Sequence, residues 1–303
     1  MTSRPFHSHS VYGLTVESWI PFPELESARI GAPTDVVFRL GEVPAELPDC
    51  RKRGARFQAE PGRLLVWLDN VARFLSVGGR EILVQPAGGA IESDLRLFLL
   101  CSPMGAILLQ RGLLPLHASA IATSSGAVVF MGPPGAGKST MAACFRKRGL
   151  RVLSDDIAVI RFDGDGRAWV EPGFPQFKLW PDAVEKLGED GSNLPKLRPR
   201  LEKRAVSFRN AYHAQPLPLA RIYVLNFRAS KNVEFASLSA PEKLAAIVEN
   251  TYRAHFVPGL GLAASHFQAA SRVAGGVPMA RIWRSKEGGP EAVADRLEAD
   301  FQP

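Results

Sequence analysis

The chain has 303 residues, of which 46% are hydrophobic and 22% are charged, and its formal net charge is +7 at pH 7. This composition is typical of a globular protein, and the length allows one large domain or two ordinary ones. No apolar run reaches the roughly 18 residues that span a bilayer. The polar start of the chain lacks the apolar segment of a secretory signal. We therefore expect no membrane association and a cytoplasmic location.

The cysteines and the net charge narrow the classes of partner. Cys50, Cys101 and Cys144 are widely spaced and odd in number; they form no metal-ligand spacing, and we expect buried structural thiols. The positive charge indicates an anionic partner, and a nucleotide or an acidic peptide satisfies it as well as a nucleic acid does. Zinc-finger spacing, an RNA-recognition signature and a basic heptad helix are all missing, so we expect no nucleic acid.

Residues 1–92 are predicted to form a β-rich N-terminal domain. Its strands are expected at Val36–Leu40, Arg63–Leu68, Phe74–Val77 and Glu81–Val84. These short β-prone runs are separated by turn-forming residues. An exposed sheet edge here would suit recognition of a peptide substrate, and scaffolding for an oligomer is equally compatible.

Residues 93–303 are predicted to form the catalytic domain, which begins with one helix over Asp94–Arg111. Strands are expected at Leu116–Ala122, Ala127–Met131, Arg151–Leu153, Ile157–Phe162 and Ala220–Phe227, and helices at Met141–Arg148, Pro241–Asn250 and Glu291–Phe301. The order strand, loop, helix, strand predicts an α/β core.

The segment Gly132–Thr140 reads GPPGAGKST and matches the phosphate-loop pattern G-x-x-x-x-G-K-[ST] between an apolar strand and a helix. Its glycines allow backbone angles that turn N–H groups toward phosphate oxygens, and the helix adds its positive end. Lys138 would lie between the β- and γ-phosphates of ATP, and the Ser139 hydroxyl would bind Mg²⁺. The predicted nucleotide-binding residues of this loop are Gly132, Gly135, Ala136, Gly137, Lys138, Ser139 and Thr140.

Asp155 and Asp156 follow a short β-run, and we expect that run to lie beside the phosphate loop. Two adjacent carboxylates near a Mg²⁺-nucleotide can divide two tasks: one accepts the proton of the acceptor hydroxyl, and the other holds the metal. A solvated turn or a helix cap is the alternative. His117, in an apolar strand, is either a core residue or a member of this site.

Neither a guanine-reading Asn-Lys-x-Asp nor a transporter signature is present, and no acid ends Ala220–Phe227, where a distant metal-binding carboxylate would be needed. These absences favour a kinase over a GTPase or a motor ATPase. The residues themselves leave the acceptor open, as they do the choice between ATP and GTP.

His117, the loop Gly132–Thr140 and the pair Asp155-Asp156 together resemble the catalytic domain of HPr kinase/phosphorylase and its relatives, over residues 114–227. Residues 112–118, 172–181 and 12–25 are more similar to the HPr-kinase-related proteins, some of which phosphorylate a precursor-peptide serine in lasso-peptide biosynthesis. The resemblance implies a P-loop, HPr-kinase-like core that uses ATP and Mg²⁺.

The resemblance also implies roles for individual residues. Asp155 would be the general base toward a serine hydroxyl, Asp156 would support the metal, and His117 would lie near the phosphates. Two departures point away from HPr as the acceptor. Thr140 stands where the regulatory enzyme has Glu, and Gln176–Leu179 replaces its Glu-x-Arg-Gly element. Regulatory members assemble as hexamers, so a homo-oligomer is compatible with the resemblance.

Residues 196–209 form a basic stretch. Its cations are Lys196, Arg198, Arg200, Lys203, Arg204 and Arg209. It is interpreted either as a solvated face or as a lid that closes over phosphate or receives an acidic substrate. We select Arg204 as the γ-phosphate contact because a guanidinium fork fits phosphate oxygens.

These observations predict a serine kinase that acts on a peptide or small protein. Two alternatives are kept: a kinase of a small hydroxyl metabolite, and a non-catalytic protein that senses a nucleotide.

Overall fold

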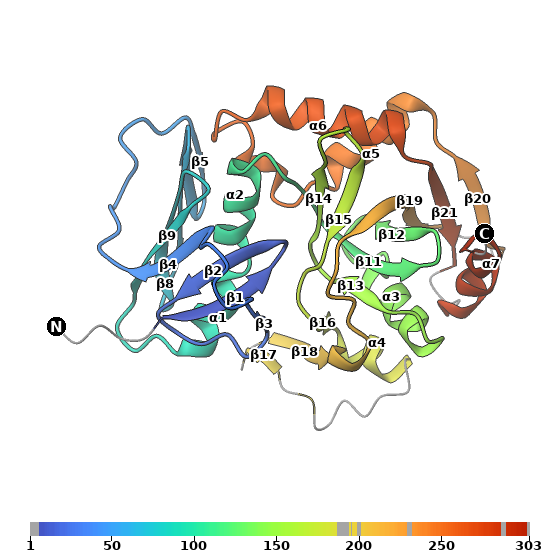
Figure 1. Ribbon diagram of the computed structural model, residues 1–303, viewed down its shortest axis with the longest axis horizontal. Helices are drawn as coiled ribbons and strands as arrows, with labels where there is room; N and C mark the ends of the chain where they lie inside the picture. Colours follow the sequence, from blue (N-terminus) through green and yellow to red (C-terminus); the bar gives the residue numbers. More distant parts are fainter. Residues whose placement is uncertain are drawn as a thin grey trace. The chain divides into compact units, whose positions relative to one another are not determined.

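The computed structural model describes residues 6–186, 194, 196–198, 201–228, 232–285 and 289–301. Within them the chain divides into two compact units, residues 1–115 with 252–269, and residues 116–251 with 270–303. Strands and helices occur in both units, so the predicted α/β class is confirmed (Figure 1). No helix among the described residues is both long and apolar enough to cross a bilayer.

The first unit is built on one large sheet. Its strands are β1 His7–Val11, β2 Leu14–Ser18, β3 Glu26–Ser27, β4 Val36–Leu40, β5 Lys52–Gly54, β6 Phe57–Glu60, β7 Arg63–Leu68, β8 Ala72–Val77 and β9 Glu81–Pro86. They pair in the order β3-β1-β2-β4-β9-β8-β7-β6-β5, parallel at β2-β4 and β4-β9 and antiparallel elsewhere. The four strands predicted in this region are present, and two of them are longer than expected.

The single helix predicted over Asp94–Arg111 is wrong. The structure has two helices, α1 Glu92–Leu99 and α2 Ser102–Gln110. Pro103 lies in the first turn of α2, where its missing N–H costs nothing, whereas in the middle of one long helix it would remove a hydrogen bond and clash with the preceding turn. The apolar pattern runs through both helices and hides the break.

Both helices belong to the first unit, which therefore extends beyond the predicted boundary at residue 92. α2 packs on β7 and β8, and its buried Ala106 and Leu109 join Leu64 of the sheet in one apolar cluster. Phe256, in the short helix η3 Ala254–Phe256, joins the same cluster from far along the chain. Burial of apolar surface between these segments is what defines the unit, and no local sequence signal marks it.

The second unit contains a central mixed sheet. Its strands are β11 Ala118–Thr123, β12 Gly126–Met131, β13 Val152–Ser154, β14 Ala158–Phe162, β15 Ala168–Glu171, β19 Leu217–Phe227, β20 Glu234–Ser237 and β21 Met279–Arg284. They run in the order β14-β15-β19-β12-β11-β13, and β21 also pairs with β19 and with β20. Strand β10, Leu114–Leu116, precedes His117, so the strand predicted over Leu116–Ala122 is divided at that histidine.

Helices and a small sheet complete the second unit. They are α3 Lys138–Lys147, α4 Pro181–Lys186, η2 Arg209–Ala211, α5 Ala240–Glu249, α6 Ala263–Gly276, which extends across the unit boundary, α7 Glu291–Phe301, and the strands β16 Gln176–Leu179, β17 Lys196–Arg198 and β18 Leu201–Ser207. α3 packs on β11 and β12, and α7 packs on α3 (Figure 1). In this core Phe130 of β12 stacks on Phe145 of α3 and on Tyr223 of β19, at centroid distances of 5.7 and 6.0 Å. Each fully buried ring of this kind stabilises the fold by about 1.5–3 kcal/mol.

Candidate functional site

The strand directions of the second unit bring four strand ends to one edge of the sheet. β12, β19 and β21 are mutually parallel, and β11 runs antiparallel to both β12 and β13. The carboxyl ends of β12, β13, β19 and β21 therefore meet at the same edge, where β11 begins. In open α/β sheets this edge is the usual position of a ligand site.

β13 pairs with β11 and not with β12, so the prediction that the acids follow the strand beside the loop is wrong by one strand. Ser119, on the intervening strand β11, contacts the first of the two acids. Its Oγ donates to Asp155 Oδ1 at 2.6 Å, and both side chains are fully buried. Residues of three strands thus meet at this edge despite the inserted strand.

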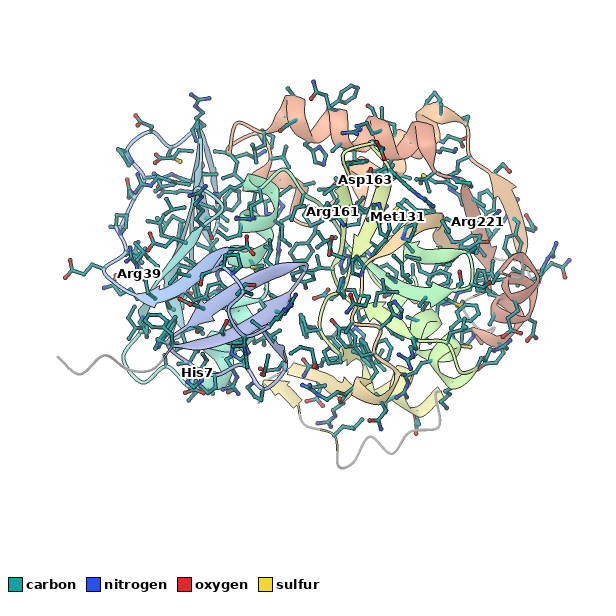
Figure 2. The ribbon with its side chains drawn as sticks, viewed as in Figure 1. His7, Arg39, Met131, Arg161, Asp163 and Arg221 are labelled. Atoms are coloured by element: carbon teal, nitrogen blue, oxygen red, sulfur yellow. The ribbon has the colours of Figure 1, made fainter. Side chains whose placement is uncertain are left out.

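The loop after β12 has a compact conformation. Met131, labelled in Figure 2, ends the strand, and Gly137 precedes α3 with a φ of 93°. A Cβ at Gly132, whose φ is 143°, would lie 2.3 Å from the carbonyl oxygen of Leu225, so only glycine fits there. The N–H of Gly132 donates to Asn250 Oδ1 at 2.9 Å, and that of Ala136 donates to Pro133 O at 3.1 Å.

Lys138 is buried inside this loop, with 6% of its surface exposed. Its Nζ donates to Gly132 O at 2.9 Å and to Pro133 O at 3.2 Å. The ammonium group is thus held over the loop by neutral carbonyls. An anion placed in the loop would replace them as the stronger, charge-assisted acceptor.

Asp155 is the inner carboxylate of the pair. Besides Ser119, it accepts from the backbone N–H of Lys178, at 3.2 Å from Oδ2. Burial raises the pKa of this carboxyl, and the side chains of Ser119 and Ser139 act in the opposite direction. Ser139 therefore places the loop close to the acid pair.

Asp156 is the outer carboxylate, and about a quarter of its side chain (23%) is exposed. Its Oδ2 accepts from Lys178 Nζ at 2.7 Å, and its Oδ1 lies 3.4 Å from His117 Nδ1. Asp156 has a φ of 68°, in the left-handed region that non-glycine residues adopt at a cost. This backbone conformation turns two consecutive carboxylates to different partners.

His117 lies between the two strands β10 and β11, beside Asp156. Its backbone N–H donates to Asn250 O at 2.7 Å, and its Nδ1 is 3.0 Å from Asp156 O. Burial, reinforced by the positive charge of Lys138, lowers the pKa of the imidazole below its ordinary value of 6.5. His117 is therefore neutral at pH 7.

The lowered pKa of His117 predicts a pH-dependent stability. In the unfolded chain the imidazole takes up a proton near pH 6.5, whereas in the folded chain it does so only at lower pH. The unfolded state therefore binds more protons in that window, and stability falls as pH falls from 6.5 toward the folded pKa. We expect His117→Gln to flatten this part of the profile, measured as urea unfolding free energy against pH. His213, whose pKa burial also lowers, provides the control variant His213→Gln, which should leave the contribution of His117 in place.

The structure does not bring Arg204 to the acid pair. In the β16–β18 register Arg204 lies opposite Leu179, while Lys178 lies opposite Ala205. Because alternate residues of a strand point to opposite faces, Arg204 shares the face of Leu179 and not that of Lys178. Thr140 lies in the first turn of α3, and Arg200 of the basic stretch falls outside the described residues.

A different guanidinium touches the loop. Arg284, the last residue of β21, donates from Nη2 to Ala136 O at 3.1 Å and lies over the Phe227 ring at 4.7 Å. It is 8% exposed, and a Cβ on Gly137 would lie 2.3 Å from its Nη2. Together with Ser119, Lys178 and Asn250, it was missed by sequence reasoning. Ser119 and Lys178 lie within residues 114–227, over which the resemblance extends, whereas Asn250 and Arg284 lie beyond them.

The contact of Arg284 with the loop predicts that Arg284→Lys weakens nucleotide binding. An ammonium group cannot both stack on Phe227 and hold the Ala136 carbonyl as the planar fork does. We expect the Kd for ATP to rise by roughly tenfold, which corresponds to about 1.4 kcal/mol. Arg281→Lys on the same strand, where the guanidinium is 3.7 Å from Glu242, is the matched control. Unchanged ATP affinity in Arg284→Lys would show that the contact of Arg284 with Ala136 is not needed for nucleotide binding.

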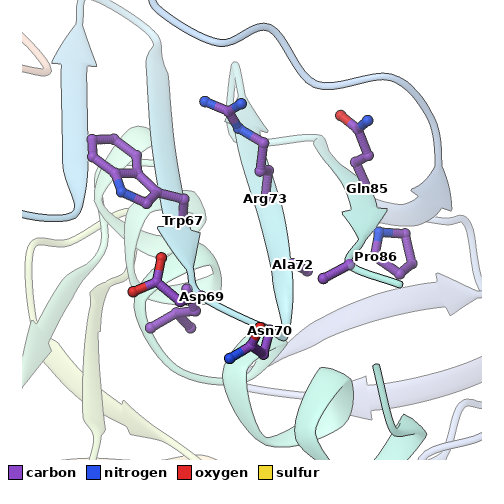
Figure 3. Close-up of a pocket in the computed structure, with 9 residues that line it drawn as sticks. Trp67, Asp69, Asn70, Ala72, Arg73, Gln85 and Pro86 are labelled. Carbon is purple, nitrogen blue, oxygen red and sulfur yellow. The ribbon is translucent and has the colours of Figure 1, made fainter. Parts of the chain in front are cut away.

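A hollow of about 380 Å³ lies in the first unit, between the β7–β8 turn and the end of β9 (Figure 3). Its polar side chains already serve the fold. Arg73 Nη2 donates to Ala45 O at 2.7 Å, and Gln85 Oε1 accepts from Val43 N at 2.9 Å. These polar side chains therefore hold the loop between β4 and β5, and we do not take this hollow as the candidate site.

No protein-family model matches the sequence, and no match is found among curated proteins. Among solved structures, the HPr(Ser) kinase/phosphatase from Coxiella burnetii is similar to 61% of this chain and 98% of its own, with 11% identity and a TM-score of 0.33. A superposition this loose assigns neither a family nor an activity to the chain. What this chain can do chemically follows from its own residues at the sheet edge.

Proposed function

We propose that the chain is a P-loop kinase that binds Mg²⁺-ATP at Gly132–Thr140 and transfers the γ-phosphoryl group to a serine hydroxyl of a peptide or small protein. The observation that carries the proposal is the buried Asp155 at the sheet edge beside the loop, hydrogen-bonded to Ser119 and to the backbone N–H of Lys178, with Asp156 next to it. A phosphate loop that only holds a nucleotide needs no second carboxylate with access to solvent.

The residues present fit a Mg²⁺-nucleotide. The Ser139 hydroxyl and the Asp155 carboxylate are oxygen groups side by side, and Mg²⁺ prefers oxygen ligands while keeping waters and phosphates in its remaining positions. Lys138 and the amino end of α3 supply the positive field that a triphosphate requires. When bound, Mg²⁺ neutralises charge on the phosphates.

The geometry favours roles for the two acids that reverse the sequence expectation. Asp155 is closed off from solvent, and the Ser139 side chain of the loop is close enough to lower its pKa, which suits the carboxylate on the metal side. Asp156 is the more exposed, and its contact with Lys178 orients it, which suits the base that receives the acceptor's proton. The hydroxyl oxygen of the acceptor would then attack the γ-phosphorus. The bond to the β-bridging oxygen breaks, ADP leaves, and the hydroxyl proton goes to Asp156.

His117 and Lys178 are assigned as positioning residues. His117 lies beside Oδ1 of Asp156, and Lys178 donates to its Oδ2. Because His117 is neutral, it adds no charge next to Lys138. The choice of a serine in a peptide rests on the motif resemblance in residues 112–118 and 172–181.

The proposal is tested by incubating the purified protein with Mg²⁺, γ-labelled ATP and a panel of serine-containing peptides, and locating the phosphate by mass spectrometry. Label on a serine supports the peptide kinase. Label only on a small molecule from a metabolite extract would replace it with a metabolite kinase. Tight ATP binding without turnover in peptides or extract would leave a nucleotide sensor.

A further inference from the structure

A pocket in the second unit lies at the end of α3 that is opposite the phosphate loop. Its volume is about 400 Å³, and it is lined by Arg146, Lys147, Ser207, Phe208, Arg209, Asn210 and Ala211. The rim residues Lys147, Ser207, Arg209 and Asn210 are exposed, while Phe208 is buried and forms the floor. α3 has ten residues, so the two ends of the helix are roughly 15 Å apart. The pocket is therefore separate from the loop.

The pocket is strongly basic. Three of its lining residues are cations, two others offer a hydroxyl and an amide, and none of the described residues that line it is acidic. Cations in the last turn of a helix are common because they interact with its negative end, and this would explain Arg146 and Lys147. Arg209 comes from a different element, η2. The neighbouring Arg148 pairs with Asp295 and Glu298 of α7.

The floor of the pocket is connected to the acid pair through one strand. Phe208 packs on Phe177 of β16 at a centroid distance of 4.4 Å, and Arg146 lies 5.9 Å from the centre of the same ring. The next residue, Lys178, donates to Asp155 from its backbone N–H and to Asp156 from Nζ. A polypeptide in the pocket would thus contact Phe208, which packs on the strand that carries Lys178, without entering the phosphate site.

We propose that this pocket is a docking site for an acidic segment of the polypeptide acceptor, an inference that rests on the proposed function. Carboxylates would pair with Arg209 and Lys147 at the rim, Ser207 and Asn210 would donate to them, and the Phe208 floor would contact apolar parts of the same segment. Cations spread over two elements of an open rim match a chain of several carboxylates better than one small anion. The positive net charge of the protein favours the encounter.

The test measures binding of a fluorescein-labelled octaglutamate peptide by anisotropy, with the full chain and without ATP. We expect Arg209→Glu and Lys147→Glu each to weaken binding by roughly tenfold, from the loss of a charge-assisted contact and the new repulsion. Arg29→Glu, an exposed cation of the first unit, changes the net charge equally and should leave the affinity unchanged. Lys138→Ala should also bind the peptide as the wild type does, so docking is measured apart from phosphoryl transfer.

Three outcomes overturn the docking site. No measurable binding, or an equal loss in Arg29→Glu, would show that the pocket has no preference for the peptide. Displacement of the peptide by inorganic phosphate at concentrations too low to act by ionic strength would make this a small-anion site. If instead the wild type binds the peptide here but labels no serine in the transfer assay, the docking surface stands and the kinase proposal alone is removed.

Discussion

Asp156→Asn is expected to reduce phosphoryl transfer by roughly 10²–10⁴-fold, the usual contribution of a general base. The carboxylate has the solvent access that a base needs, and asparagine would keep its size without accepting the proton. The loop and Asp155 would keep their contacts, so the affinity for Mg²⁺-ATP should change little. Single-turnover transfer to the acceptor peptide found in the panel measures the rate, and a separate ATP titration measures the affinity for Mg²⁺-ATP.

Asp155→Asn provides the contrast, because the inner carboxylate is buried and accepts from Ser119 and from the backbone N–H of Lys178. Here we expect weaker Mg²⁺-ATP binding and a lower thermal midpoint, since the amide replaces a buried acceptor of several hydrogen bonds. Asp163→Asn serves as control: this carboxylate of the β14–β15 hairpin, labelled in Figure 2, accepts from Trp169 Nε1 at 2.7 Å and from the backbone N–H of Arg167 at 2.8 Å. Intact transfer in Asp156→Asn, with transfer lost and ATP affinity unchanged in Asp155→Asn, would restore the original order of roles.

Lys138→Ala is expected to lower kcat/KM by roughly 10²–10³-fold, because it removes a preorganised charge from the developing negative charge of the transferred group. The substitution also removes the donor to the carbonyls of Gly132 and Pro133, so part of the loss should appear in ATP affinity. Transfer kinetics over a range of ATP concentrations separate the two parts.

Lys243→Ala is the matched control for this variant. Its Nζ also donates to a backbone carbonyl, that of Val277 at 3.0 Å, but it lies on α5 and touches no residue of the loop. We expect unchanged kinetics in Lys243→Ala. If both lysine variants lose activity equally, the effect of Lys138→Ala reflects general destabilisation and the loop assignment fails.

Periodicity and turn residues predicted much of the local structure. The strands over Val36–Leu40 and Arg63–Leu68 and the helix over Glu291–Phe301 have the predicted bounds. The helix break before Pro103 was missed because both halves share one apolar face, and the apolar pattern does not record where the backbone turns.

The sequence by itself determined the Gly-rich loop of residues 132–140 between a strand and a helix, and the adjacency of the two acids, because both are contiguous in the chain. A strand, three glycines, a lysine and a helix start are sufficient to specify that conformation locally. Only the tertiary structure decided what surrounds them. Asn250 reaches Gly132 across 118 residues of chain, and Arg284 reaches Ala136 across 148.

The order of the strands also decided which acid faces the loop. β11 lies between β12 and β13, so that Ser119 supports Asp155 and leaves Asp156 to Lys178 and His117. The pairing of strands distant in sequence depends on burial of their faces and on chain connections, and no residue type marks it. For that reason the sequence could not show that Arg204 lies on the opposite face of β18 from the one that Lys178 shares, or that a guanidinium from the end of β21 contacts the loop.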